Sequence, residues 1–150
     1  MIQFIKISIC TFTIWVLAAL INAILSASCL LFEPGEFDNW ADNFGLSFVV
    51  TLVFSVPSIF IIWLLFLMNN TKDIQTLFQL LYRTAFILAV FSAALFAVSF
   101  YAMFQNYVFL LGLCILVAAV TAIMCHHSFI ATIYKQKLYS HAQRNHQIQI

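Results

Sequence analysis

Hydrophobic positions gather into four long segments, separated by short stretches in which polar residues appear. The segments cover residues 7–31, 46–68, 84–103 and 107–130, and none of them contains Asp, Glu, Lys or Arg. A hydrocarbon core about 30 Å thick requires about 20 helical residues to cross it. Each segment reaches that length, so the pattern predicts an all-α membrane protein built as a bundle of four transmembrane helices.

The composition agrees with this pattern. Of the 150 residues, 65% are hydrophobic and only 7% are charged, whereas a soluble domain averages about 25% charged residues. We expect one transmembrane domain over residues 1–139 and a polar, disordered tail over residues 140–150. The net charge of +1 gives no electrostatic reason to bind nucleic acid, which leaves the lipid bilayer as the first expected partner.

The placement of charge predicts the orientation of the chain. All six basic residues lie before the first segment, between the second and third, or after the fourth: Lys6, Lys72, Arg83, Lys135, Lys137 and Arg144. The connection over residues 33–45 carries four acidic residues and no basic one. By the positive-inside rule, both chain ends face the cytoplasm. Chain size and the lack of targeting motifs make a bacterial inner membrane the default location.

The first segment has an alternative interpretation as a cleaved signal. Ser26, Ala27 and Ser28 are small, as a signal peptidase requires, and Cys29 follows them as in a lipoprotein. However, the apolar run of about 25 residues exceeds the usual 7–15 of a signal peptide. Ser26 also stands where a lipoprotein signal favours Leu. We expect the segment to be retained, and cleavage is the alternative.

Two stretches between the segments also carry helical periodicity. Residues 37–44 place Phe37, Trp40, Ala41 and Phe44 on one face. This predicts a short amphipathic helix on the outer surface. Residues 72–83 place Ile74, Leu77, Phe78 and Leu81 on one face. That helix is expected to run directly into the third segment, giving one helix of about 32 residues.

Small residues recur at every fourth position in each segment, and such spacing lets helices approach closely in lipid. The stripes are Ala19, Ala23 and Ala27; Ser47, Thr51 and Ser55; Ala85, Ala89, Ala93 and Ala97; and Cys114, Ala118 and Ala122. Alanine is common in membrane helices, but four stripes in four segments favour helix contacts. Their depths predict that the first and second helices meet in the outer half of the bilayer. The third and fourth are expected to meet near its centre.

Two residues inside the segments need a structural account. The amide of Asn22 lies near mid-membrane, where Thr51 or Ser55 could be its partner; a local bond or a water is the alternative. Pro57 has no N–H to give the carbonyl of Val53, so the second helix is expected to kink there. The kink is either a packing feature, or a hinge that exposes a carbonyl along a path.

The densest group of metal-ligand types is Cys125-His126-His127. Adjacent residues on a helix point about 100° apart, so these three side chains cannot converge on one ion. The sequence contains no motif for a nucleophile, a phosphate loop or a zinc protease. We therefore predict no metal site, no cofactor and no catalytic residue. His126 and His127 remain candidate functional polar residues at the inner end of the fourth segment.

Three functions fit these observations. The first is a non-catalytic accessory or interaction subunit, bound to a membrane-protein partner or to copies of itself. The second is an oligomeric transporter or pore, whose path is lined by the stripe from Ser47 to Ser55 together with Asn22 and Pro57. The third is a membrane enzyme that uses His126 or His127 at the level of the inner headgroups. The lack of chemical motifs favours the first.

Overall fold

A computed structural model of the chain describes residues 2–31, 39–68, 74–104 and 107–136, nearly all of them helical. The long helices are α1 (Ile2–Leu30), α2 (Trp40–Met68), α3 (Ile74–Phe104) and α4 (Val108–Cys125). A last helix covers residues 127–136. All four long helices have the length and composition to cross a membrane. The prediction of an all-α protein with four apolar spans is therefore confirmed.

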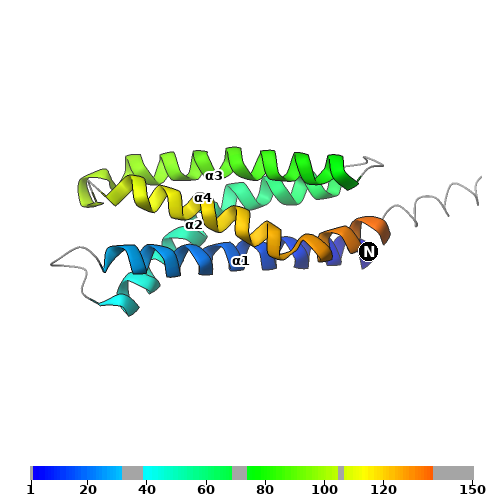
Figure 1. Cartoon of the computed structure of the whole chain (residues 1–150). Coiled ribbons are helices and arrows are strands. Elements are labelled where there is room, and N and C mark those ends of the chain that lie inside the picture. The colour runs from blue at the N-terminus through cyan, green and yellow to red at the C-terminus, as the bar shows by residue number, and fades with distance from the viewer. Residues whose placement is uncertain (1, 32–38, 69–73, 105–106, 137–150) are drawn as a thin grey trace, which may run out of the picture.

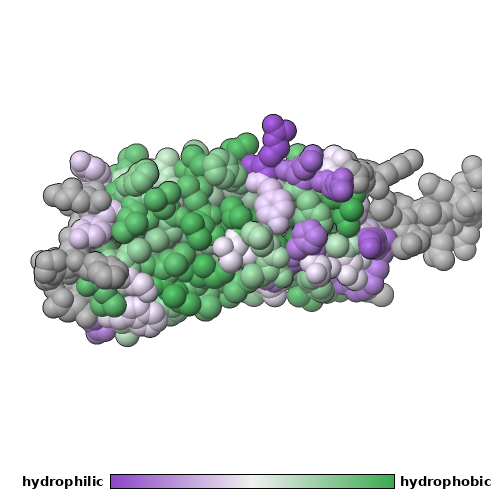
Figure 2. All heavy atoms as spheres, in the orientation of Figure 1, coloured by the Kyte–Doolittle hydropathy of each residue, from purple (hydrophilic) through white to green (hydrophobic). Residues whose placement is uncertain are grey.

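The helices lie side by side as an elongated bundle (Figure 1). α1 packs against α2 and α4, and α3 packs against the same two helices. Lys6 Nζ donates a hydrogen bond of 2.8 Å to Gln136 Oε1, so α1 begins beside the last helix. Figure 2 shows hydrophobic side chains over the middle of the visible face, with hydrophilic ones gathered toward that end.

α2 is one continuous helix of 29 residues. The backbone N–H of Ala41 donates to Asn39 Oδ1 over 3.1 Å, which satisfies a free donor at the start of the helix. The expected short surface helix is not observed as a separate element among the described residues, because the helical turns that begin at Trp40 continue through Gly45 into the span. Phe37 lies outside the described residues.

α3 is likewise continuous over 31 residues, so the prediction that the stretch before the third span is helical and joined to it is confirmed from Ile74 onward. Residues 72 and 73 lie outside the described residues. Leu77 and Leu81 are fully buried in a cluster with Ile130 and Ile133 of the last helix. A second cluster, near the opposite end of the bundle, contains Leu30, Val108 and Leu111. Apolar contacts therefore close the bundle at both ends.

The fourth segment, expected to be helical over residues 107–130, is interrupted at His126. The backbone there has φ −93° and ψ 3°, outside the usual helical values. The His126 N–H reaches both Ala122 O and Ile123 O, at 3.3 and 3.1 Å. The ring atom Nδ1 lies 2.9 Å from the same Ala122 carbonyl. The backbone N–H and the ring Nδ1 of His126 therefore compete for the Ala122 carbonyl at the point where α4 ends and the last helix begins.

Candidate functional site

Three hydrogen bonds between side chains join α1 to α2 along their length. The pairs are Trp63 Nε1 to Ser8 Oγ (3.0 Å), Trp15 Nε1 to Ser55 Oγ (2.8 Å) and Asn22 Nδ2 to Thr51 Oγ1 (2.7 Å). On α1 the three positions are seven residues apart, so they share one face of the helix. Each such bond inside a membrane contributes about 0.6 kcal/mol on average.

In this seam, the row of hydrogen bonds between α1 and α2, the hydroxyls of Thr51 and Ser55 each both donate and accept a hydrogen bond. Thr51 Oγ1 donates to Ser47 O at 2.6 Å and accepts from Asn22. Ser55 Oγ donates to Thr51 O and accepts from Trp15. Asn22 therefore has one of the two partners that the sequence nominated, and Trp15 takes the other. The sequence reasoning missed Trp15; the seven-residue spacing from Ser8 to Asn22 was the signal that could have found it.

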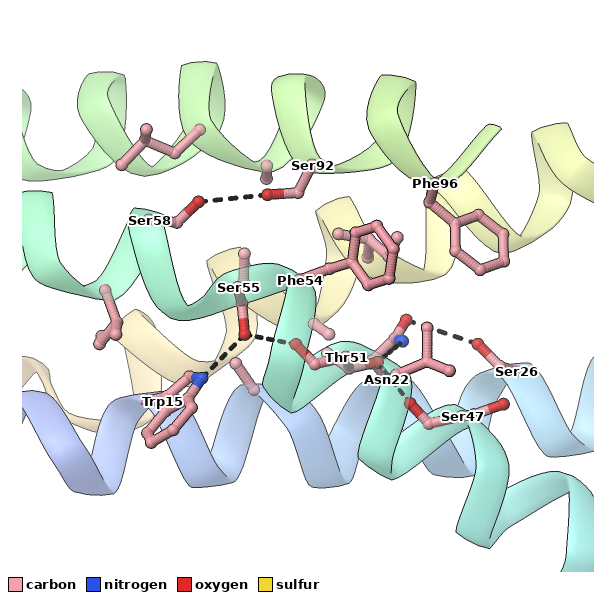
Figure 3. Close-up of a pocket in the computed structure, with 18 of the residues that line it drawn as sticks. Trp15, Asn22, Ser26, Ser47, Thr51, Phe54, Ser55, Ser58, Ser92 and Phe96 are labelled. Carbon is pink, nitrogen blue, oxygen red and sulfur yellow. Dashed lines mark hydrogen bonds between the residues drawn. The ribbon is translucent and has the colours of Figure 1, made fainter. Parts of the chain in front are cut away.

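A cavity of about 180 Å³ lies between the four helices, next to this seam. Most of its lining is apolar, including Phe54, Phe96 and Phe100. Polar side chains enter the lining from three helices: Asn22 and Ser26 from α1, Thr51, Ser55 and Ser58 from α2, and Ser92 from α3. Figure 3 shows these groups on different walls of the same space.

A pair of serines joins α2 to α3 at the cavity wall. Ser58 Oγ and Ser92 Oγ are 3.2 Å apart, and either one can donate to the other. Two hydroxyls carry two hydrogens, and the bond between them uses one. The other hydrogen has no acceptor among the residues that the structure describes. Ser92 is only 7% exposed, whereas Ser58 is partly exposed.

Asn22 is in a similar position on the α1 wall. It is 4% exposed, and its amide nitrogen donates to Thr51 with one of two hydrogens. Its carbonyl oxygen receives only a long contact of 3.5 Å from Ser26 Oγ. Within the described part of the chain, the second amide hydrogen has no acceptor. A buried donor without a partner requires an explanation, such as local strain, a bound water or ion, or a functional role.

Pro57 does not line the cavity, and it is exposed on the outer face of α2. The helix continues on both sides of it. The α2 ribbon changes direction between the turn that carries Thr51 and the turn that carries Ser58 (Figure 3). The helix thereby contacts α1 through Thr51 and α3 through Ser58. The change of direction falls in the stretch that contains Val53, whose carbonyl Pro57 leaves without a backbone N–H partner.

The small-residue stripes lie as follows. Fully or nearly buried are Ala19, Ala23, Ala27, Ala85, Ala89, Cys114, Ala118 and Ala122. Half-buried are Ser47, Thr51, Ser55, Ala93 and Ala97. Ala89 of α3 and Ala118 of α4 both line the cavity. In the middle of the bundle, Ala89 and Ala118 therefore line the cavity in addition to packing between helices.

The two histidines are not brought together with a third ligand. The His127 ring stacks on Phe78 of α3, with centroids 4.0 Å apart, while the His126 ring is turned to the Ala122 carbonyl. Cys125 is exposed. In the described ranges, no three His, Cys, Asp or Glu side chains are grouped as metal ligands.

No protein-family model, curated protein or solved structure matches the chain. The site is therefore interpreted from its own chemistry. It is a mostly apolar space inside a bundle of apolar helices, with an amide on one wall and a serine pair on another.

Proposed function

We propose that the protein is a non-catalytic accessory subunit, which binds a larger membrane protein through the outer faces of its helices. One observation carries the proposal: several pairs of polar side chains hydrogen-bond each other across helices. Among the described residues the pairs are Ser8 with Trp63, Trp15 with Ser55, Asn22 with Thr51, and Ser58 with Ser92. Groups used in this way hold helices together, so the bundle is a preassembled unit.

We further propose that both chain ends face the cytoplasm of a bacterial inner membrane. Lys6 lies beside Gln136 at one end of the bundle, and Lys135 is exposed next to it. Asp42 is exposed in the first turn of α2, which follows the acidic connection. Basic residues near the ends of spans favour the cytoplasmic side.

A transporter or pore formed by several copies is the second candidate. It is favoured by the cavity, because Ser47, Thr51 and Ser55 of the α2 stripe line it together with Asn22. A single bundle of four helices encloses little volume, so a continuous path would require oligomers.

Photo-crosslinking from single positions distinguishes the two candidates. A photoreactive amino acid is placed in turn at four lipid-exposed positions, one on each helix: Phe12, Val53, Phe91 and Val117. An accessory subunit should crosslink to one protein in stoichiometric yield, from one or two adjacent helices only. The remaining positions serve as matched controls that label lipid.

Two results would contradict the accessory role. Equal lipid labelling from all four positions would show that no protein covers any helix. Crosslinks only between copies of this chain, together with solute flux in liposomes, would favour the oligomeric pore instead.

A further inference from the structure

The cavity presents two hydrogen-bond donors that the protein leaves without acceptors. One belongs to the Ser58–Ser92 pair between α2 and α3, and the other is the second amide hydrogen of Asn22 on α1, each within the described residues. Asn22 and Ser92 are both less than a tenth exposed. A buried donor left unsatisfied is destabilising, so a bound acceptor would be stabilising at each point.

The size and lining of the cavity restrict what can supply those acceptors. Its volume of about 180 Å³ is slightly above the roughly 150 Å³ of an engineered apolar cavity that stays dry and binds benzene. Phe54, Phe96 and Phe100 contribute aromatic surface to the lining. A molecule of about one substituted six-membered ring fits this space, whereas a charged one would lose its hydration.

The positions of the donors restrict the ligand further. Asn22 lies on the α1 wall, and the serine pair lies between α2 and α3, on another side of the cavity (Figure 3). A ring with acceptors at two opposite sides, such as a 1,4-dione, matches donors that lie on two different sides of the cavity. Largely apolar pockets with a few converging polar groups are the usual form of small-molecule sites.

We propose that this cavity is a binding site for a neutral, lipophilic ring that carries carbonyl acceptors, the chemistry of a quinone. The ligand reaches the site from the bilayer and accepts hydrogen bonds from Asn22 and from the serine pair. The proposed binding site is independent of the proposed accessory role, because ligand binding in the cavity does not require a protein partner on the outer faces of the helices.

Tryptophan fluorescence tests the site directly, because Trp15 lines the cavity and quinones quench tryptophan. The full chain is prepared in detergent as W40F/W63F, which leaves Trp15 as the reporter, and as W15F/W63F, which leaves Trp40. Trp40 is exposed at the start of α2 and reports quinone dissolved in the micelle. The probe is tetramethyl-1,4-benzoquinone, whose methylated ring resists addition of the cysteine thiols. Saturable quenching of Trp15 and linear quenching of Trp40 are expected.

A pair of substitutions tests the role of the hydroxyls. S58A/S92A removes both members of the serine pair, so neither is left buried alone, and it should weaken quinone binding about fivefold, the effect of one ordinary hydrogen bond. The matched control S28A/T132A removes two hydroxyls that bond their own helices away from the cavity, and it should change nothing. Tetramethylbenzene has the same ring without carbonyls, so its own inhibition constant, measured by competition with the quinone, should be the same in both variants.

Three results would overturn the proposal. The first is quenching of Trp15 that is as linear as that of Trp40, as expected if the cavity holds only water or closes. The second is equal affinity of S58A/S92A and its control, since the serine pair would then supply no bond. The third is unchanged binding to A89L, a variant whose larger side chain fills the cavity wall. Circular dichroism and gel filtration confirm beforehand that each variant is folded.

Discussion

Asn22 is a buried polar residue whose side chain helps to hold two helices together. It is buried inside an apolar bundle, and its 2.7 Å bond to Thr51 links α1 to α2. Thr51 keeps its bond to Ser47 O without Asn22. Loss of the amide therefore removes an interhelical bond without leaving an isolated donor on α2.

Asn22→Ala should lower the free energy of unfolding by about 0.6–1.7 kcal/mol, from the average to the maximum measured for such bonds in a membrane protein. The measurement is denaturant unfolding in detergent. Thr13→Ala is the matched control, because the Thr13 hydroxyl bonds the Cys10 carbonyl of its own helix and should change stability little. Equal stability of the two variants would mean that the Asn22 bond does not hold the helices together.

Cys29 of α1 and Cys114 of α4 form a second residue-scale contact, with sulfur atoms 3.8 Å apart. A disulfide needs about 2.05 Å between sulfurs, which a small movement of two side chains provides. In a chain with Cys10 and Cys125 changed to Ser, a mild oxidant should join Cys29 to Cys114 within one molecule. Mass spectrometry of peptides under non-reducing conditions detects the link. A chain that keeps only Cys10 and Cys114 is the control, and a link formed as readily there would contradict this placement.

At the scale of elements, α3 and α4 approach each other where Ala93 faces Gly112. A Cβ added at Gly112 would lie 3.6 Å from the Ala93 Cβ, an ordinary van der Waals contact. Ala94 is the next residue along α3 and is exposed. The two neighbours therefore offer a matched comparison between a helix contact and lipid.

Ala93→Leu should destabilise the protein by about 1–3 kcal/mol, the usual cost of overpacking, while Ala94→Leu should leave stability nearly unchanged. Thermal melting in detergent compares the two variants with the parent chain. If both variants melt with the parent, the small residues of α3 do not form a close contact with α4.

At the scale of the whole molecule, the even number of apolar helices places the start of α1 and the last described helical turn at the same end of the bundle. The contact between Lys6 and Gln136 shows this directly. Which membrane face that end occupies follows only from the charge pattern, since basic residues are retained on the cytoplasmic side.

Thiol labelling in whole cells tests this orientation. With the native cysteines replaced, Cys introduced at Asn39 should react with a membrane-impermeant reagent, because Asn39 precedes α2 at the acidic end. Cys introduced at Asn145 should react only after the cells are permeabilised. The reverse labelling pattern would invert the proposed topology.

The sequence by itself determined the four spans and the continuity of α3. Spanning a bilayer depends on length and apolar composition, and both are properties of a local segment. It also nominated Thr51 as a partner for Asn22, because few polar groups lie at the same depth. Hydrogen bonding within each helix then fixes the elements without help from their neighbours.

Only the tertiary structure decided which faces meet. In lipid, an apolar side chain gains little by facing another helix instead of the bilayer, so hydrophobic periodicity does not mark the inside. Ala89 and Ala118 are buried, and both also border the cavity, which the spacing of small residues did not indicate. The seven-residue spacing places Trp15 on the same face of α1 as Asn22, but only the packing of α1 on α2 shows that Ser55 is its partner. The pairing of Ser58 with Ser92 likewise depends on where α2 crosses to α3, which no local segment of the sequence encodes.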